Sequence, residues 1–175
     1  TLAQLAREGS RIVVAVALLV VLLLAFLPEM VAIIGGSRYA PAGPAAALAL
    51  GATLATCLYV VNTLPIAMAR ATTQLAWSAI VGVAVAIAAN LALVGTFGSA
   101  GTAAAMLAGQ IVAAATGAWF ARRHPRPAGL AVGVYAIVVA TFALAIGCAV
   151  AWGPPLWSRL GLLALMVALM WREGR

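Results

Sequence analysis

The chain has 175 residues, of which 66% are hydrophobic and only 7% are charged. Soluble domains carry about 25% charged residues, so this composition excludes an ordinary soluble enzyme and predicts an integral membrane protein. The net charge of +7 comes from arginine alone, and the arginines lie at the ends of apolar runs, which is typical of membrane orientation rather than nucleic-acid binding.

Six apolar runs are long enough to form transmembrane helices, since about 20 apolar residues cross the bilayer core. We predict an all-α, polytopic bundle, because the runs lack the alternation of barrel strands and a helix satisfies its backbone groups internally. Residues 1–127 would hold four of these helices, and residues 128–175 would add two. The chain begins with threonine, and we expect it to be the C-terminal part of a larger transporter. The predicted helices span residues 12–34, 45–69, 74–94, 101–121, 128–152 and 156–171.

The third and fourth runs are separated by a short turn rich in glycine and serine. Small residues recur at every fourth position of the fourth run, and the third run carries a partial counterpart. Such rows let the backbones of two membrane helices approach closely, so we predict a tight hairpin at the centre of the bundle. The rows are Gly101, Ala105, Gly109, Ala113, Gly117 and Ala121 in the fourth run, and Ser78, Gly82, Ala86 and Asn90 in the third.

The arginines predict the orientation of the chain. With six helices, eight arginines fall on one side of the membrane and two, Arg38 and Arg159, fall on the other. Positive charge is enriched in cytoplasmic loops, so we expect both ends of the chain to face the cytoplasm. Trp77, Trp119 and Trp171 would then lie at the inner boundary of the membrane, and Trp152 and Trp157 at the outer one.

The end of the first run carries a recognisable pattern. Leu27-Pro28 is followed by the segment 33–42, in which glycine, tyrosine and alanine recur at three-residue intervals, at Gly36, Tyr39 and Ala42. This pattern resembles the helix end found in the C-terminal half of bacterial polysaccharide flippases, which belong to the multidrug, oligosaccharidyl-lipid and polysaccharide exporter superfamily.

A second pattern resembles the same family. An asparagine-leucine pair begins at Asn90, and a glycine-x-x-glycine turn follows at Gly98 and Gly101. The departure is Thr102, where the family has alanine. We expect Asn90 to help end the third helix. The resemblance covers roughly residues 12–123.

The resemblance implies a fold and a function. The chain would be the last six helices of a twelve- or fourteen-helix flippase in the bacterial cytoplasmic (inner) membrane. By alternating access it would move lipid-linked oligosaccharide repeat units, which are polyprenyl pyrophosphate sugars, for the biosynthesis of cell-surface polysaccharide such as lipopolysaccharide. A polysaccharide polymerase complex would be a partner, and no cofactor is implied.

Polar side chains inside a membrane are costly, so they are candidates for a substrate cavity. Gln110 either bonds a neighbouring helix or lines the cavity. Asn62 either compensates for the kink at Pro65 or contacts substrate, and we place Tyr59 of the same run with it. Arg70 either anchors the cytoplasmic end of its helix or binds a pyrophosphate through its paired donors.

The remaining polar residues have simpler explanations. Arg122, Arg123 and Arg126 either set topology or hold anionic lipid headgroups, and His124 is expected to be a solvated loop residue. Glu29 would pair with Arg38 or be hydrated at the membrane interface, and a third interpretation is a role in coupling transport to a cation. Cys57 and Cys148 are expected to be packing residues. No acid–base pair or metal-ligand spacing is present, so we predict that the chain is not an enzyme and binds no metal.

Three other functions fit the same residues. The chain would be a multidrug or metabolite exporter, or a lipid II flippase, of the same superfamily. From a different class, it would be a membrane scaffold subunit that transports nothing. The absence of a mid-membrane acid disfavours the exporter, and a lipid II flippase would be expected to carry more cationic cavity residues.

Overall fold

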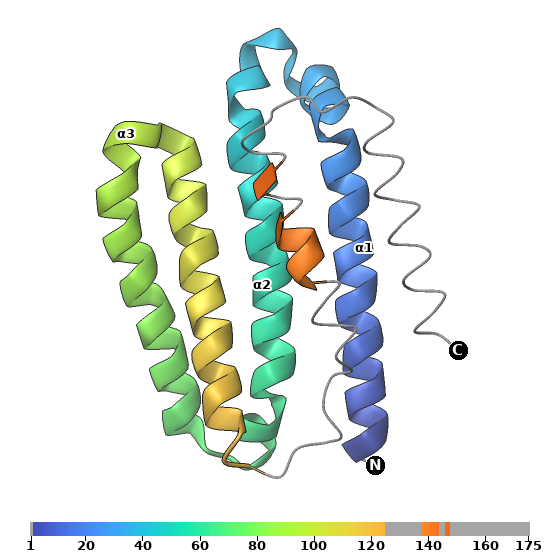
Figure 1. The fold of residues 1–175 in the computed structure, drawn as a ribbon, viewed down its shortest axis with the longest axis vertical. Helices are drawn as coiled ribbons and strands as arrows, with labels where there is room; N and C mark the ends of the chain where they lie inside the picture. The colour runs from blue at the N-terminus through green and yellow to red at the C-terminus, as the bar shows by residue number, and fades with distance from the viewer. Residues whose placement is uncertain (1, 125–137, 144–145, 148–175) are drawn as a thin grey trace.

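The computed structural model describes residues 2–124, 138–143 and 146–147, and the regular structure in that part of the chain is helical throughout. A long helix α1 (Leu2–Gly35) leads through a short 3-10 helix η1 (Ser37–Ala42) into α2 (Gly43–Met68), and a tight turn leads into α3 (Thr72–Ala121) (Figure 1). The all-α prediction is confirmed for these residues.

Within the described part of the chain, three helices are long and apolar enough to cross a membrane by length and composition, namely residues Arg11–Gly35, Arg38–Met68 and Thr72–Ala121. The third folds back on itself at Gly98, where the backbone leaves helical geometry. We call residues 72–97 the first arm of α3 and residues 99–121 its second arm; they run antiparallel (Figure 1). The first four predicted helices therefore correspond to α1, α2 and the two arms. Most of the predicted fifth helix and all of the sixth lie outside the described residues.

The predicted span 12–34 agrees with the apolar part of α1, Arg11–Gly35, and the helix itself extends further toward the N-terminus, to Leu2. In this polar extension, Arg11 Nη1 is bonded to Glu8 Oε1 at 2.9 Å, one turn away. The third predicted span ends at residue 94, whereas the first arm continues to the bend at Gly98, so Asn90 does not end it. Asn90 therefore lies within the helix, and its Oδ1 atom is buried with no hydrogen-bond partner among the described residues.

Helix α2 lies between α1 and α3. The side of α1 that faces α2 carries a stripe of buried residues at three- and four-residue intervals, as expected for one face of a helix. The core that joins the two helices also receives Ala114 from the second arm and Val138 from the helical residues 138–143. Its members are Val13, Ala17, Val20, Val21, Leu24, Leu27, Ala47, Leu54, Leu58, Ala114 and Val138.

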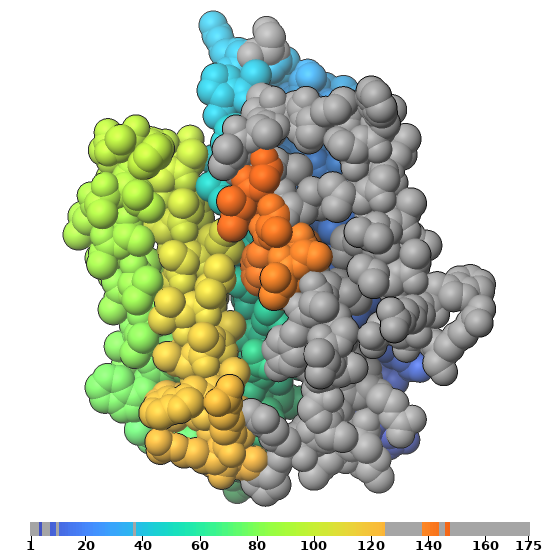
Figure 2. Space-filling view, in the orientation of Figure 1, coloured from blue at the N-terminus to red at the C-terminus, as the bar shows by residue number. Residues whose placement is uncertain are grey.

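The arms of α3 lie at one edge of the described bundle. In the space-filling view, the first arm is outermost and the second arm separates it from residues 138–143 (Figure 2). The outer face of the first arm is apolar and exposed, with Leu91 at 76% and Val83 and Ile87 at 57% of their full accessibility. A bilayer would solvate such a face.

Charge divides the two ends of the bundle. Arg70 in the turn between α2 and α3, and Arg122 and Arg123 after α3, lie at the end where α1 begins, and we call this the basic end. Arg38 lies in η1, at the opposite end, which also holds the Gly98 turn. The sorting of these four arginines agrees with the sequence prediction, whereas the side of the membrane that each end faces stays a prediction.

Candidate functional site at the interface of α2 and α3

The first pattern of the resemblance forms the turn between α1 and α2. Gly36 has a φ of 66°, which L residues rarely adopt, and its carbonyl accepts a 3.2 Å hydrogen bond from the N–H of Tyr39. The Tyr39 side chain lies against Gly35, where a Cβ atom would come within 2.7 Å of its ring. Ala42 is the N-cap residue of α2. The three predicted residues therefore each have a place in one compact turn.

The second pattern forms the bend of α3. Gly98 has φ 54° and ψ −128°, a combination open to glycine and strained for other residues. Three residues later, a Cβ atom on Gly101 would lie 2.5 Å from the carbonyl oxygen of Leu93. One glycine thus permits the reversal of the chain, and the other permits the two arms to meet directly beyond it.

The predicted row of small residues packs the two arms together. All six of its members in the second arm are buried. A Cβ on Gly82 would lie 2.8 Å from the carbonyl oxygen of Gly109, and a Cβ on Gly109 would lie 2.7 Å from that of Gly82. Ala113 and Ala86 flank this crossing at 2.6 Å from the same two hypothetical atoms. The arms are therefore in backbone contact, which confirms the tight packing predicted for the hairpin. The hairpin lies at one edge of the described bundle (Figure 1), and its predicted place at the centre of the whole bundle stays a prediction.

Tyr59 joins α2 to both arms of α3. Its ring packs against Gly117 of the second arm, 3.6 Å from the position of a Cβ there. Its hydroxyl lies 3.2 Å from Ser78 Oγ and 3.4 Å from the carbonyl oxygen of Leu75, both in the first arm. Ser78 is fully buried. Tyr59, a predicted cavity residue, thus connects three helical segments, and no sequence pattern indicated Ser78 as its partner.

Gln110 lies on the side of the second arm that faces α2. Leu107, one turn before it, clusters with Ala52 and Ala55 of α2, and Gly117, two turns after it, meets Thr63 and Tyr59. Gln110 shares this helical face and is half-buried between the two contacts.

Asn62 lies on α2, three residues after Tyr59. It is half-buried, and it lies between Val61, which approaches Gly9 of α1, and Thr63, which approaches Gly117 of α3. Three of the four predicted cavity residues therefore lie at the interface between α2 and α3 or at its edge. They are Tyr59 and Asn62 of α2 and Gln110 of α3.

Arg70 lies apart from these three, at the basic end. It is exposed, and its φ of 54° makes it the non-glycine residue with a positive φ among the described residues. The N–H groups of Arg70 and Ala71 bond the carbonyls of Ala67 at 3.0 Å and Ile66 at 3.1 Å, which is the Schellman ending of a helix. Glycine normally occupies the left-handed position of this turn, and an L residue there costs about 1–2 kcal/mol. An arginine is held where the backbone favours glycine.

The prediction for His124, which follows the second arm, was wrong. His124 is half-buried rather than solvated, because its Nε2 lies 2.8 Å from Oε1 of Gln74, near the start of the first arm. The hydrogen bond joins the two open ends of the hairpin. Neither residue's sequence context pointed to this pairing, which depends on how the arms fold back.

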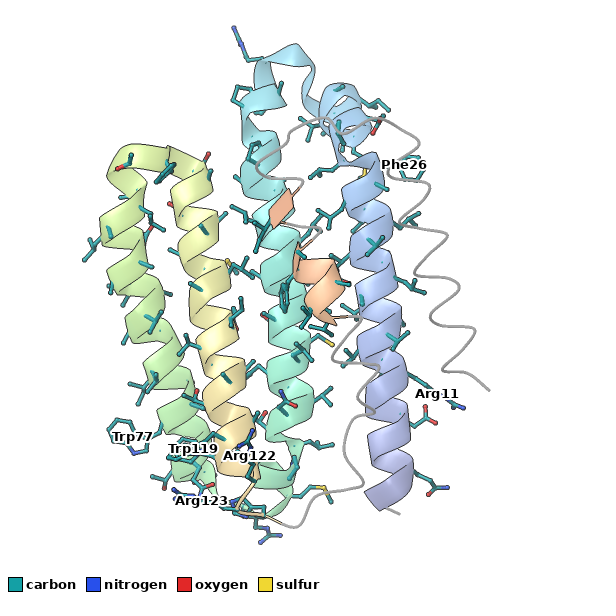
Figure 3. All side chains as sticks on the ribbon, in the orientation of Figure 1. Arg11, Phe26, Trp77, Trp119, Arg122 and Arg123 are labelled. Atoms are coloured by element: carbon teal, nitrogen blue, oxygen red, sulfur yellow. The ribbon has the colours of Figure 1, made fainter. Side chains whose placement is uncertain are left out.

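Side chains at the basic end also form an aromatic group. The guanidinium carbon of Arg123 lies 4.9 Å from the centroid of the Trp119 ring and 6.0 Å from that of Phe120. Trp77 and Trp119 are both more than half exposed and lie at the same end (Figure 3). The two tryptophans thus lie at one end of the bundle, as the predicted aromatic belt requires, and the side of the membrane that this end faces stays a prediction. Trp152, Trp157, Trp171, Arg126 and Cys148 lie outside the described residues.

The fold and site define a class only coarsely: an all-helical chain whose long apolar helices are compatible with a membrane protein. In the part of the chain that the structure describes, no group of three or more His, Cys, Asp or Glu side chains is placed to hold a metal ion. Comparisons with known protein families, with curated proteins and with solved structures found no match.

Proposed function

We propose that this chain is part of the C-terminal lobe of a bacterial flippase that moves lipid-linked oligosaccharides across the cytoplasmic membrane. The observation that carries the proposal is the pair of turn motifs. Both patterns that resemble the polysaccharide flippases coincide with chain reversals at one end of the bundle, and each contains a glycine with a positive φ, at Gly36 and Gly98. The resemblance therefore falls on residues that shape the fold.

Substrate would enter the proposed lobe from the basic end. The guanidinium of Arg70 is exposed there, and it would bind the pyrophosphate of the lipid carrier through paired donors. The half-buried side chains of Gln110 and Asn62, together with Tyr59, would meet the sugar once α2 and α3 move relative to the remainder of the transporter, as alternating access requires.

The test is genetic complementation of a deletion of the full-length gene. Wild type should restore surface polysaccharide and clear lipid-linked repeat units that accumulate inside the cell. Arg70→Ala should fail to do so, and Arg70→Lys should restore part of the activity, because it keeps the charge but loses the paired donors.

Arg70→Gly is the matched control for the backbone. It removes the guanidinium but relieves the left-handed strain, so it should stabilise the turn by about 1 kcal/mol and still fail to transport. Normal transport by the glycine variant would show that substrate transport does not need the guanidinium of Arg70. Unchanged polysaccharide on deletion would instead favour an exporter or a scaffold.

A further inference from the structure

We propose that the basic end of α3 is a binding site for one anionic phospholipid, whose phosphodiester is held by Arg122 and Arg123 beside Trp119. This inference concerns a resident lipid and does not require that the chain transports anything.

The first argument is that the described residues supply no counter-charge to Arg122 and Arg123. The sequence contains three acids, and two of them, Glu8 and Glu29, lie in the described residues. Glu8 pairs with Arg11 at 2.9 Å, and Glu29 lies near the opposite end of α1. Among the described residues, neither Arg122 nor Arg123 forms an ion pair, and both are exposed. An anion at these guanidinium groups would therefore come from outside the described chain.

The second argument is that hydrogen bonds hold the backbone that carries the two arginines. The N–H groups of Arg122, Arg123 and His124 bond the carbonyls of Trp119, Phe120 and Ala121 at 3.0–3.2 Å, so the helix tightens through these residues. His124 then bonds Gln74, which fixes the segment to the first arm. Arg123 stacks on Trp119, and a stacked guanidinium keeps its outer donors free for phosphate oxygens.

The third argument is the level at which the site would lie in a bilayer. Exposed tryptophans mark the headgroup level of a bilayer. Trp77 and Trp119 lie at the same end of the bundle as Arg122 and Arg123 (Figure 3), and Arg123 lies over the Trp119 ring. The apolar, exposed surface of the α3 arms continues from this level toward the Gly98 turn. A ligand that fits all of these features has a phosphate at the interface and acyl chains along the helix. That is a phospholipid, rather than a soluble phosphate.

The experiment uses the 175-residue chain with Trp119 as its one tryptophan and the others replaced by phenylalanine, reconstituted in phosphatidylcholine vesicles. Dibrominated phosphatidylglycerol should quench Trp119 more strongly than dibrominated phosphatidylcholine. Arg122→Gln and Arg123→Gln should each reduce this preference by roughly fivefold, the weight of one charge near a membrane surface. Circular dichroism should show unchanged helix content in every variant.

Arg38→Gln is the matched control, because it removes the same charge from the opposite end. It should leave the preference at Trp119 unchanged, while Arg123→Lys should retain a preference between those of the wild type and Arg123→Gln. Millimolar inorganic phosphate should not abolish the preference. Equal quenching by the two lipids, equal losses in Arg38→Gln and Arg123→Gln, or competition by inorganic phosphate would each overturn the lipid site. None of these outcomes depends on flippase activity, so the two proposals fail separately.

Discussion

Several single residues in this chain are constrained by backbone geometry that their neighbours do not share. Gly98 adopts φ 54° and ψ −128°, whereas Gly95, one turn earlier, has no positive φ. A Cβ at either position would have no atom within 4 Å, so only the backbone conformation distinguishes them. Two glycines in the same apolar segment thus have different roles. Arg70 is the reverse case, an L residue where glycine is usual.

The two glycines give a matched prediction. Gly98→Ala should lower the free energy of unfolding by about 1–3 kcal/mol, because alanine cannot adopt that conformation without strain. Gly95→Ala should be neutral or should raise stability by about 0.5–1 kcal/mol, since alanine is the better helix former. The measurement is the unfolding of each variant in detergent, followed by circular dichroism. Equal effects at the two positions would contradict the assignment of the bend to Gly98.

At the scale of the element, α3 is stabilised as a hairpin by close backbone approach rather than by large side chains. The arms cross where Gly82 and Gly109 meet, and each would place a Cβ against the carbonyl of the other. Without a hydrophobic drive between helices in lipid, packing of this kind is what holds two arms together. Tyr59 and His124 add polar contacts, to Ser78 and Gln74, near the open ends of the hairpin.

We therefore expect Gly109→Ala to separate the arms. The added methyl group would lie 2.6 Å from Ala86 Cβ, so the helices must shift, at a cost of about 1–3 kcal/mol. Double electron–electron resonance between spin labels on exposed positions of the two arms should show a longer distance. Ala115→Leu, a larger change on an exposed face of the same arm, should leave the distance unchanged. The hairpin packing described above would be wrong if the two variants gave the same distance.

At the scale of the whole molecule, the separation of charge between the two ends predicts how the chain sits in a membrane. Arg70, Arg122 and Arg123 gather at one end and Arg38 lies at the other. Cytoplasmic loops are enriched in arginine, so the basic end should face the cytoplasm.

Cysteine labelling in intact cells tests this orientation. In a background in which both native cysteines are replaced by serine, Arg38→Cys should react with a membrane-impermeant maleimide added from outside. Arg122→Cys should react only after the membrane is permeabilised. The reverse pattern would show the opposite orientation. Labelling of both cysteines from outside would contradict the prediction that the segments between them span the membrane.

The sequence by itself determined the features that act over a few residues. Apolar runs predicted the helices, glycine motifs marked the turns at Gly36 and Gly98, and the four-residue row predicted the packing face of the second arm. Only the tertiary structure decided that Tyr59 meets Ser78 and that His124 meets Gln74. Propensity and solvation are local properties of the chain. The contacts instead join residues 19 and 50 positions apart, so they depend on where the helices cross and how the arms fold back.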